Sequence, residues 1–243
     1  ADLSRSMKIF VVGASGGVGS QVVRLALEQG HAVAALARDT TKISSDHENL
    51  VKQKMDMQAC DVDALADTIA GADMVLSCVG NRRGDPPVVA TATSKIMSAM
   101  AKAGVRRMAL VSSIGVGDSR LQLLRGGFGG VIFSIIFATI LRGTKEDLNA
   151  AEALAIGAPA GMIYGAATPH SRPDGVSVVV VRPAGLSDAP GSSGDYEVAL
   201  SHGTLGMSVR REDVARFMLT LTQDTQYDNG AVSVGGNAPR TGH

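Results

Sequence analysis

The chain has 243 residues, and its 23 Lys and Arg balance its 23 Asp and Glu. It holds 29 Gly but only five Phe, three Tyr and no Trp. This length supports a core that needs no covalent staples, while the zero net charge and the shortage of aromatic rings argue against binding to a nucleic-acid backbone or to stacked bases.

Apolar runs of strand length alternate with segments of helix length along the whole chain. In chain order we expect strand 8–14, helix 18–29, strand 31–38, strand 50–55, helix 61–70, strand 74–80, helix 88–103, strand 107–113, helix 145–155, strand 176–183, helix 211–222 and strand 231–234. Asp61 has the residue type of an N-cap, and Gly104 that of a helix stop. The alternation is typical of a doubly wound α/β fold, a parallel sheet with helices on both faces. We predict one Rossmann-type domain over residues 7–243, with residues 1–6 as an N-terminal extension.

Two segments are atypical of this plan: the loops 115–143 and 156–175. Within the first, residues 126–141 form an uncharged run of 16 residues with four Gly, shorter than the ~20 residues of a spanning helix. We therefore expect no membrane span, although peripheral contact stays open. The run is interpreted either as the lining of an apolar substrate pocket, with Phe128, Phe133 and Phe137 as its rings, or as a surface that docks a protein partner.

The cysteines bear on the compartment. Cys60 and Cys78 are too few for a disulfide scaffold and have neither zinc nor thioredoxin spacing. We expect no secretory signal in residues 1–6, and we interpret these residues either as an expression scar or as the remnant of a cleaved transit peptide. We expect a reducing compartment, the cytoplasm or an organellar matrix or stroma, rather than secretion.

A glycine pattern lies where the first strand meets the first helix. The segment 13–19 reads GASGGVG, so Gly13, Gly16 and Gly19 are spaced three residues apart. Glycine lets the chain turn tightly and lets its amides approach a pyrophosphate at the positive helix N-terminus. The predicted dinucleotide-binding residues of this turn are Gly13, Ser15, Gly16, Gly17, Val18 and Gly19.

The end of the second strand selects the cofactor. A carboxylate there binds the ribose hydroxyls of NAD, whereas an arginine accommodates the 2′-phosphate of NADP. This chain has Arg38 at that position, with Lys42 soon after it. We predict NADP(H) in preference to NAD(H), although the neighbouring Asp39 leaves the NAD alternative open.

Two further strand ends belong to the same ligand edge of the sheet. Asp56 and Met57 follow the third strand, where a carboxylate can accept from the adenine amino group. Cys78, Val79 and Gly80 end the fourth strand and place small residues over the central ribose.

Five segments together resemble a known family. They are the glycine turn, VSSIGVGDS at 111–119, KEDLNAAEALA at 145–155, VVVRPAGLSD at 179–188 and VRREDVARFMLTL at 209–221. In this order they resemble the atypical short-chain dehydrogenase/reductases, in particular the NmrA-like and biliverdin-IXβ-reductase-like branch. Residues 156–175 look like an insertion relative to that family.

The resemblance implies an extended NADP(H) with its nicotinamide near the ends of strands four to six. Ser112 and Ser113 match the family's serine position and are catalytic candidates, of which one would hydrogen-bond the acceptor or the carboxamide. Lys145 is the third catalytic candidate and would either hold the nicotinamide ribose or lend positive charge. Pro183, Ala184 and Gly185 match the loop beside the nicotinamide. The tyrosine of the usual Tyr-x-x-x-Lys pair is missing, because Leu141 stands four residues before Lys145.

Three functions are consistent with these residues. The first is an NADPH-dependent reductase of an apolar acceptor such as a quinone, flavin or tetrapyrrole, which delocalises charge and needs no strong proton donor. The second is a non-catalytic NADP(H) sensor or a structural subunit of a larger assembly, for example an organellar one. An epimerase using bound NADP is the weakest without the tyrosine. No histidine cluster indicates a metal site, and we expect a monomer by default.

Overall fold

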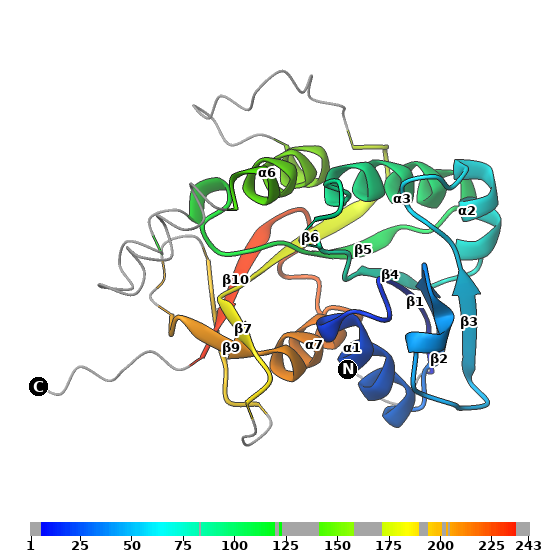
Figure 1. Cartoon of the computed structure of the whole chain (residues 1–243), viewed down its shortest axis with the longest axis horizontal. Coiled ribbons are helices and arrows are strands. Elements are labelled where there is room, and N and C mark those ends of the chain that lie inside the picture. Colours follow the sequence, from blue (N-terminus) through cyan, green and yellow to red (C-terminus); the bar gives the residue numbers. More distant parts are fainter. Residues whose placement is uncertain are drawn as a thin grey trace, which may run out of the picture.

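The computed structural model describes residues 6–82, 84–119, 122, 141–157, 172–189, 194–200, 203 and 205–236. Its centre is an eight-stranded sheet (Figure 1). The strands lie in the order β3 (Leu50–Lys54), β2 (Ala32–Ala37), β1 (Lys8–Val12), β4 (Met74–Ser77), β5 (Arg107–Val111), β6 (Ser177–Pro183), β10 (Ala231–Gly235) and β8 (Glu197–Ala199). All neighbouring pairs run parallel except β10 and β8, which are antiparallel.

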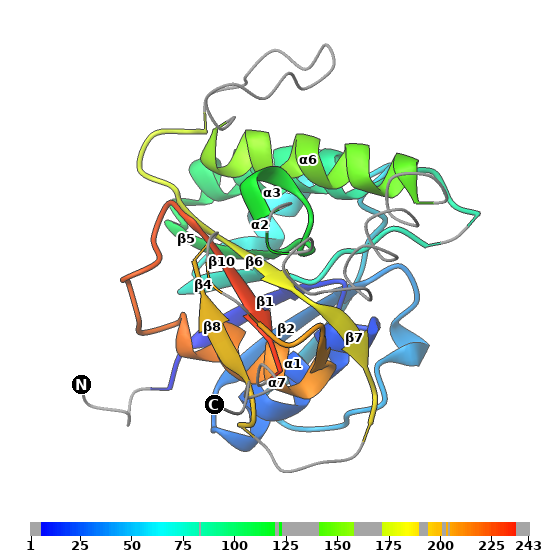
Figure 2. The same ribbon diagram turned by 90° about the vertical axis from the view of Figure 1, so that its left-hand side faces the viewer.

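Helices cover both faces of this sheet. One layer contains α1 (Gly17–Glu28) and α7 (Arg211–Thr220), and the opposite layer contains α2 (Val62–Ile69), α3 (Val89–Ala103) and α6 (Arg142–Ile156) (Figures 1 and 2). The predicted α/β fold with helices on both faces is confirmed.

Two hydrophobic cores follow from the alternation of side chains along each strand. In β1, Ile9 and Val11 pack into the core beneath α1 and α7, while Phe10 and Val12 pack into the core beneath α2, α3 and α6. All four are completely buried. Because each strand is buried on both faces, it reads as a continuous apolar run rather than an alternating one.

The helix ends follow their local chemistry. Asp61 accepts hydrogen bonds from the amides of Asp63 and Ala64 and so caps α2, while Gly104 ends α3 in the left-handed region at φ 71°. Both expectations are confirmed. Helix α6 begins at Arg142, three residues before the predicted start, and Arg142 pairs with Glu146 one turn later at 2.8 Å.

Within the described residues, the sequence pattern missed three strands and two short helices. A small second sheet pairs β7 (Gly185–Ser187) with β9 (Ser208–Arg210) in parallel, and β8 extends the main sheet by three residues. Each strand is too short to show a period. The two 3₁₀ turns, η1 (Thr40–Lys42) and η2 (Gly117–Ser119), follow β2 and β5.

Strand order reverses between β1 and β4. From β1 the chain proceeds outward through β2 to β3, and it then returns to β4 on the other side of β1. In open α/β sheets ligands bind at such a switch point, beyond the carboxyl ends of the strands. The glycine turn after β1 lies at this point.

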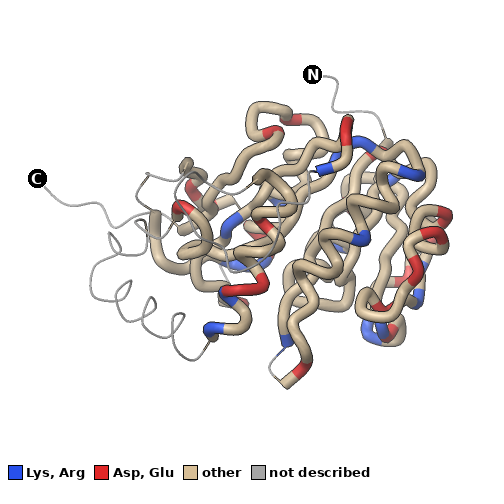
Figure 3. Tube along the Cα trace, turned by 90° about the horizontal axis from the view of Figure 1, so that it is seen from above, with Lys and Arg blue, Asp and Glu red and all other residues tan. Residues whose placement is uncertain are grey.

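Charges of both signs are distributed over the described trace (Figure 3). Among the residues that the structure describes, no helix combines the length and the apolar character needed to cross a bilayer. Residues 126–140 of the apolar run, including Phe128, Phe133 and Phe137, lie outside the described residues, as do 158–171 of the predicted insertion.

Candidate functional site

The glycine turn is packed too tightly for side chains at two of its positions. Gly13 has φ +78°, and a Cβ built on it would lie 2.7 Å from the carbonyl oxygen of Cys78 at the end of β4. A Cβ on Gly19 would overlap the carbonyl oxygen of Gly13. The turn is held by the amides of Gly13 and Ala14, which both donate to the carbonyl of Leu36 in β2, at 3.0 and 3.1 Å.

The start of α1 is open to a ligand. Gly16 is its N-cap and, having no side chain, makes no side-chain cap hydrogen bond. No acidic residue stands in the first turn, and Ser15, Gly16 and Gly17 are exposed. The amides of a helix start carry partial positive charge and seek acceptors, so this turn fits a pyrophosphate.

The end of β2 presents a cation beside the turn. The side chain of Arg38 is 56% exposed, and its Nη1 lies 3.1 Å from Oδ2 of Asp85 in the loop after β4. Asp39 accepts from the amide and hydroxyl of Thr41, at 3.1 and 2.6 Å, and pairs with Lys42 at 3.5 Å. Asp39 is therefore engaged by its own turn, and Arg38 is bound only through an exposed pair among the described contacts.

The end of β4 leaves polar atoms unsatisfied. Within the described part of the chain, Ser77 Oγ and Asn81 Nδ2 are buried without a hydrogen-bond partner. Asn81 Oδ1 accepts from the amide of Val88 at 2.9 Å and so ties down the loop before α3. Buried orphan donors are costly, and their position at the ligand edge fits a polar ligand.

The remaining adenosine-side candidates lie at the predicted strand ends. Asp56 is exposed and accepts from the amide of Gln58 at 3.0 Å, while Met57 is buried. Burial raises the pKa of the Cys78 thiol to about 12, so this thiol stays protonated at neutral pH and lines the site without acting as a nucleophile. Val79 is half-buried and Gly80 is exposed.

Helix α6 fixes the loops of this edge through the side chains of Asp147 and Asn149. Asp147 accepts from the amides of Val89 and Ala90, at 2.8 and 3.1 Å, and so caps α3 from another helix. Asn149 accepts from the amide of Gly117 at 3.1 Å. The sequence analysis missed both residues, because their partners lie 58 and 32 residues away and no local spacing indicates them.

Ser112 belongs to a buried ionic network. Its hydroxyl donates to Oε1 of Glu152 at 2.5 Å, and Arg182 donates to both oxygens of Glu152, at 3.0 and 2.6 Å. Arg182 also pairs with Asp118. Burial alone would lower the pKa of Arg182, but the hydrogen bonds and charges of Glu152 and Asp118 raise it.

The other residues predicted around the nicotinamide have mixed surroundings. Ser113 is half-buried and donates to the carbonyl of Ile114 at 3.1 Å. Lys145 is half-buried in the first turn of α6. Pro183 and Ala184 are buried where β6 ends, and Gly185 begins β7. The structure thus brings Ser112 and Ser113 to the end of β5, beside the end of β6.

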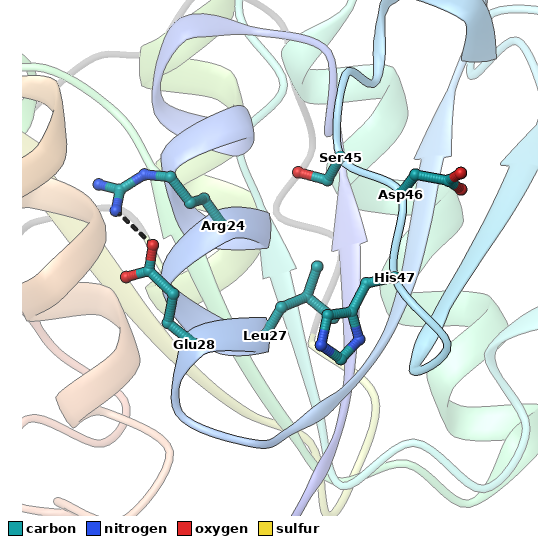
Figure 4. A pocket seen from close by; sticks show the side chains of 6 residues that line it. All are labelled: Arg24, Leu27, Glu28, Ser45, Asp46 and His47. Atoms are coloured by element: carbon teal, nitrogen blue, oxygen red, sulfur yellow. Dashed lines mark hydrogen bonds and ion pairs between the residues drawn. The ribbon is translucent and has the colours of Figure 1, made fainter.

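An open hollow of the described surface lies elsewhere. It measures about 280 Å³ and is lined by Arg24, Leu27, Glu28, Ser45, Asp46 and His47 (Figure 4). Its helical residues belong to the last turns of α1, the end opposite the glycine turn. It is therefore separate from the candidate site. The described residues also contain no cluster of His, Cys, Asp or Glu suited to a metal ion.

A comparison with protein families identifies the family of the chain. A model of the NAD(P)H-binding family matches residues 13–225. The chain belongs to this family. Its match begins at Gly13 and takes in every strand end discussed above, so NAD(P) binding and the resemblance to the atypical short-chain dehydrogenase/reductases are both confirmed.

Individual relatives of this NAD(P)H-binding protein are distant. It is 26% identical over 234 residues to the isoflavone reductase homolog IRL of Zea mays, covering 93% of this chain and 67% of the maize protein. It is 30% identical over 117 residues to cinnamoyl-CoA reductase 2 of Arabidopsis thaliana, covering 44% of this chain and 35% of that one. The chain spans about a third of the Arabidopsis protein's length.

Solved structures share the fold. ChuY, an anaerobillin reductase from Escherichia coli O157:H7, superposes with a TM-score of 0.69 at 22% identity, covering 97% of this chain and all of ChuY. A short-chain dehydrogenase/reductase from Veillonella parvula, solved in complex with NADP, gives 0.67 at 18% identity with 98% of each chain covered. At these identities the likeness is one of fold.

Proposed function

We propose that the protein binds NADP(H) in preference to NAD(H) and reduces an apolar acceptor such as a quinone, a flavin or a tetrapyrrole. The observation that carries the cofactor preference is Arg38. Its guanidinium stands at the end of β2, is more than half exposed, and is held by a single exposed carboxylate of Asp85. An arginine at this position accommodates a 2′-phosphate.

The proposed division of labour follows the strand ends. The turn after β1 would hold the pyrophosphate, Arg38 the 2′-phosphate, and Asp56 with Met57 the adenine. Cys78, Val79 and Gly80 would line the central ribose, and the residues Ser112, Ser113, Lys145, Pro183, Ala184 and Gly185 the nicotinamide end. NADPH supplies a hydride when bound.

The proposed acceptor class follows from the lack of the family's tyrosine proton donor. The hydroxyl of Ser112, which matches the serine position of the family, donates its hydrogen bond to Glu152 inside a buried network. Lys145 has no tyrosine four residues before it, so the Tyr-x-x-x-Lys pair is missing. A simple ketone needs a proton at its oxygen, whereas an extended conjugated acceptor spreads the incoming charge. Support comes from ChuY, which shares the fold and is an anaerobillin reductase.

The second candidate is a non-catalytic NADP(H) sensor or a structural subunit that keeps the cofactor site. The buried position of Ser112 favours it, because 7% exposure leaves little of that residue for an acceptor to touch. The apolar residues 126–141 would then dock a protein partner in place of lining a substrate pocket.

Turnover assays separate these two functions. Purified protein is mixed with NADPH and a panel of quinones, flavins and tetrapyrroles, and the loss of NADPH absorbance is followed. The reductase account predicts oxidation above background with at least one class of acceptor. It also predicts slower oxidation at low NADPH concentration in Arg38→Asp than in the control Lys102→Gln. The side chain of Lys102 on α3 pairs with Asp63 on α2, away from the glycine turn. Tight NADPH binding without oxidation of any acceptor would contradict the reductase and favour the sensor.

A further inference from the structure

Arg211, the first residue of α7, lies against the glycine turn. A Cβ built on Gly17 would come within 2.5 Å of its Cδ, 2.6 Å of its Nε and 3.6 Å of its Cζ. The arginine stem therefore fills the space that a side chain at position 17 would occupy. Gly17 has no left-handed backbone, and the close neighbours of a Cβ at this position all belong to the Arg211 side chain.

Contacts on either side fix this approach. Helix α7 packs beside α1 (Figures 1 and 2), and Arg24 of α1 pairs with Glu212 of α7 at 3.3 Å. The next residue, Asp213, is buried and binds Arg210 at 2.7 Å. Arg211 thus lies between Arg210 and Glu212, which both form ion pairs, and its side chain lies against Gly17 at the start of α1.

The partner of Arg211 is easily displaced. Its Nη1 lies 2.6 Å from Oδ2 of Asp188, whose side chain is 82% exposed. Asp188 comes directly after β7. An exposed ion pair contributes little free energy, and a guanidinium has five N–H donors in a planar fork. A ligand with several anionic oxygens competes well for such a group.

A cation at this position is also unfavourable for the helix itself. Arg211 occupies the N-terminus of α7, where the helix dipole favours anions. The chain places acidic Glu212 and Asp213 in that first turn, as expected, and still has arginine at the first position. The unfavourable placement indicates a role outside helix stability.

We infer that Arg211 binds the pyrophosphate of the dinucleotide, and that Asp188 holds its guanidinium when no dinucleotide is bound. The inference rests on the proposed cofactor site and deepens it. The residues Ser15, Gly16 and Gly17 are exposed at the start of α1, and the side chain of Arg211 lies against Gly17. Arginine matches the oxygens of a phosphate with two parallel hydrogen bonds.

This role differs from that of Arg38 in what it recognises. NADP and NAD share the pyrophosphate, whereas the 2′-phosphate belongs to NADP alone. Loss of Arg211 should therefore weaken both dinucleotides equally, and loss of Arg38 should weaken mainly NADPH. The two arginines are thus separable by the same pair of titrations.

Calorimetric titrations of NADPH and NADH into the wild-type protein, Arg211→Gln and Asp188→Asn test the inference. Arg211→Gln should weaken both dinucleotides by about 10-fold, the size of a lost charge-assisted hydrogen bond. Asp188→Asn should tighten both by roughly 2- to 5-fold, because an exposed competing pair is removed. The matched control is Arg216→Gln on the same helix, which removes a pair to Glu212 and should leave both affinities unchanged.

The opposite effects of the two variants exclude a merely structural pair. If Arg211 and Asp188 only tie β7 to α7, both variants act in the same direction on affinity, and the inference is overturned. Unchanged affinity in Arg211→Gln overturns it too, while the cofactor site stands. Absence of binding to the wild-type protein instead overturns the cofactor site itself. Thermal melts accompany each titration, and if Arg211→Gln does not fold, Asp188→Asn decides alone.

Discussion

Arg182 and Glu152 form a two-point ion pair beneath the ends of β5 and β6, with Nε to Oε1 at 3.0 Å and Nη2 to Oε2 at 2.6 Å. Their side chains are only 1% and 2% exposed. Gly117 is required above them, because a Cβ there would lie 2.5 Å from Nη2 of Arg182. The pair joins strand β6 to helix α6 and holds the loop after β5 in place.

Removing the charge of Glu152 should be costly. Glu152→Gln leaves Arg182 buried with only Asp118 as its anionic partner, and breaking a buried pair costs about 3–5 kcal/mol. Ser112→Ala removes one hydrogen bond to the carboxylate and should cost about 2 kcal/mol. Urea unfolding measures both, with Ser113→Ala as the control. Equal stability of the two serine variants would contradict the network role of Ser112.

Asp147 caps α3, so replacing this partly exposed residue should lower the free energy of unfolding. Asp147→Ala leaves the amides of Val89 and Ala90 without their acceptor, and loss of an N-cap costs about 0.5–2 kcal/mol. Glu146→Ala, one residue away, removes only an exposed pair with Arg142 and should stay within about 0.5 kcal/mol. Chemical denaturation compares the two, and a larger loss in Glu146→Ala would refute the capping role.

The glycine turn predicts a contrast between two glycines of similar backbone. Gly13 and Gly30 have φ +78° and +79°, but a Cβ at Gly30 would meet nothing within 4 Å. Gly30→Ala should cost about 1 kcal/mol from the left-handed backbone alone, and Gly13→Ala distinctly more, because its methyl group meets the carbonyl of Cys78. Thermal unfolding of both variants checks this, and equal losses would argue against the tight approach.

His31 predicts a dependence of stability on pH. Burial lowers the pKa of this imidazole below its ordinary value near 6.5, and its Nδ1 accepts from the amide of Met7 at 3.4 Å. Between the lowered folded pKa and 6.5 the unfolded chain binds more protons, so the free energy of unfolding falls as the pH falls below 6.5.

A substitution isolates this contribution. In His31→Gln the part of the pH dependence just below pH 6.5 should disappear, while the carboxylate-driven loss at lower pH remains. Urea unfolding at neutral and mildly acidic pH measures it for both proteins. An unchanged slope in the variant would show that His31 does not titrate differently in the folded chain.

Local sequence patterns are sufficient to predict the main strands, several helix ends and the glycine turn. The buried strands read as apolar runs because both faces are covered, and Asp61 and Gly104 mark helix ends through bonds within a few residues. The glycine turn is also local, since Gly13, Gly16 and Gly19 meet one another across one tight bend. These features depend on neighbouring residues, which spacing in a sequence can show.

The rest of the site depends on contacts that no spacing shows. Asp85 meets Arg38 across 47 residues, and Asp147 meets α3 across 58. Arg210 pairs with Asp213 only three residues away, whereas the approach of Arg211 to Gly17 joins distant parts of the chain. The packing of α1 against α7 brings Arg211 to Gly17, and the packing of α3 against α6 brings Asp147 to the start of α3.

The central claim is that this site binds NADP(H) through Arg38, and direct titration tests it most simply. Dissociation constants for NADPH and NADH are measured by calorimetry for the wild-type protein and for Arg38→Asp. We expect NADPH to bind the wild type at least about 10-fold more tightly, the size of a charge-assisted interaction, and Arg38→Asp to lose most of that preference. Equal affinity of the wild type for both dinucleotides, or equal loss of both in the variant, would contradict it.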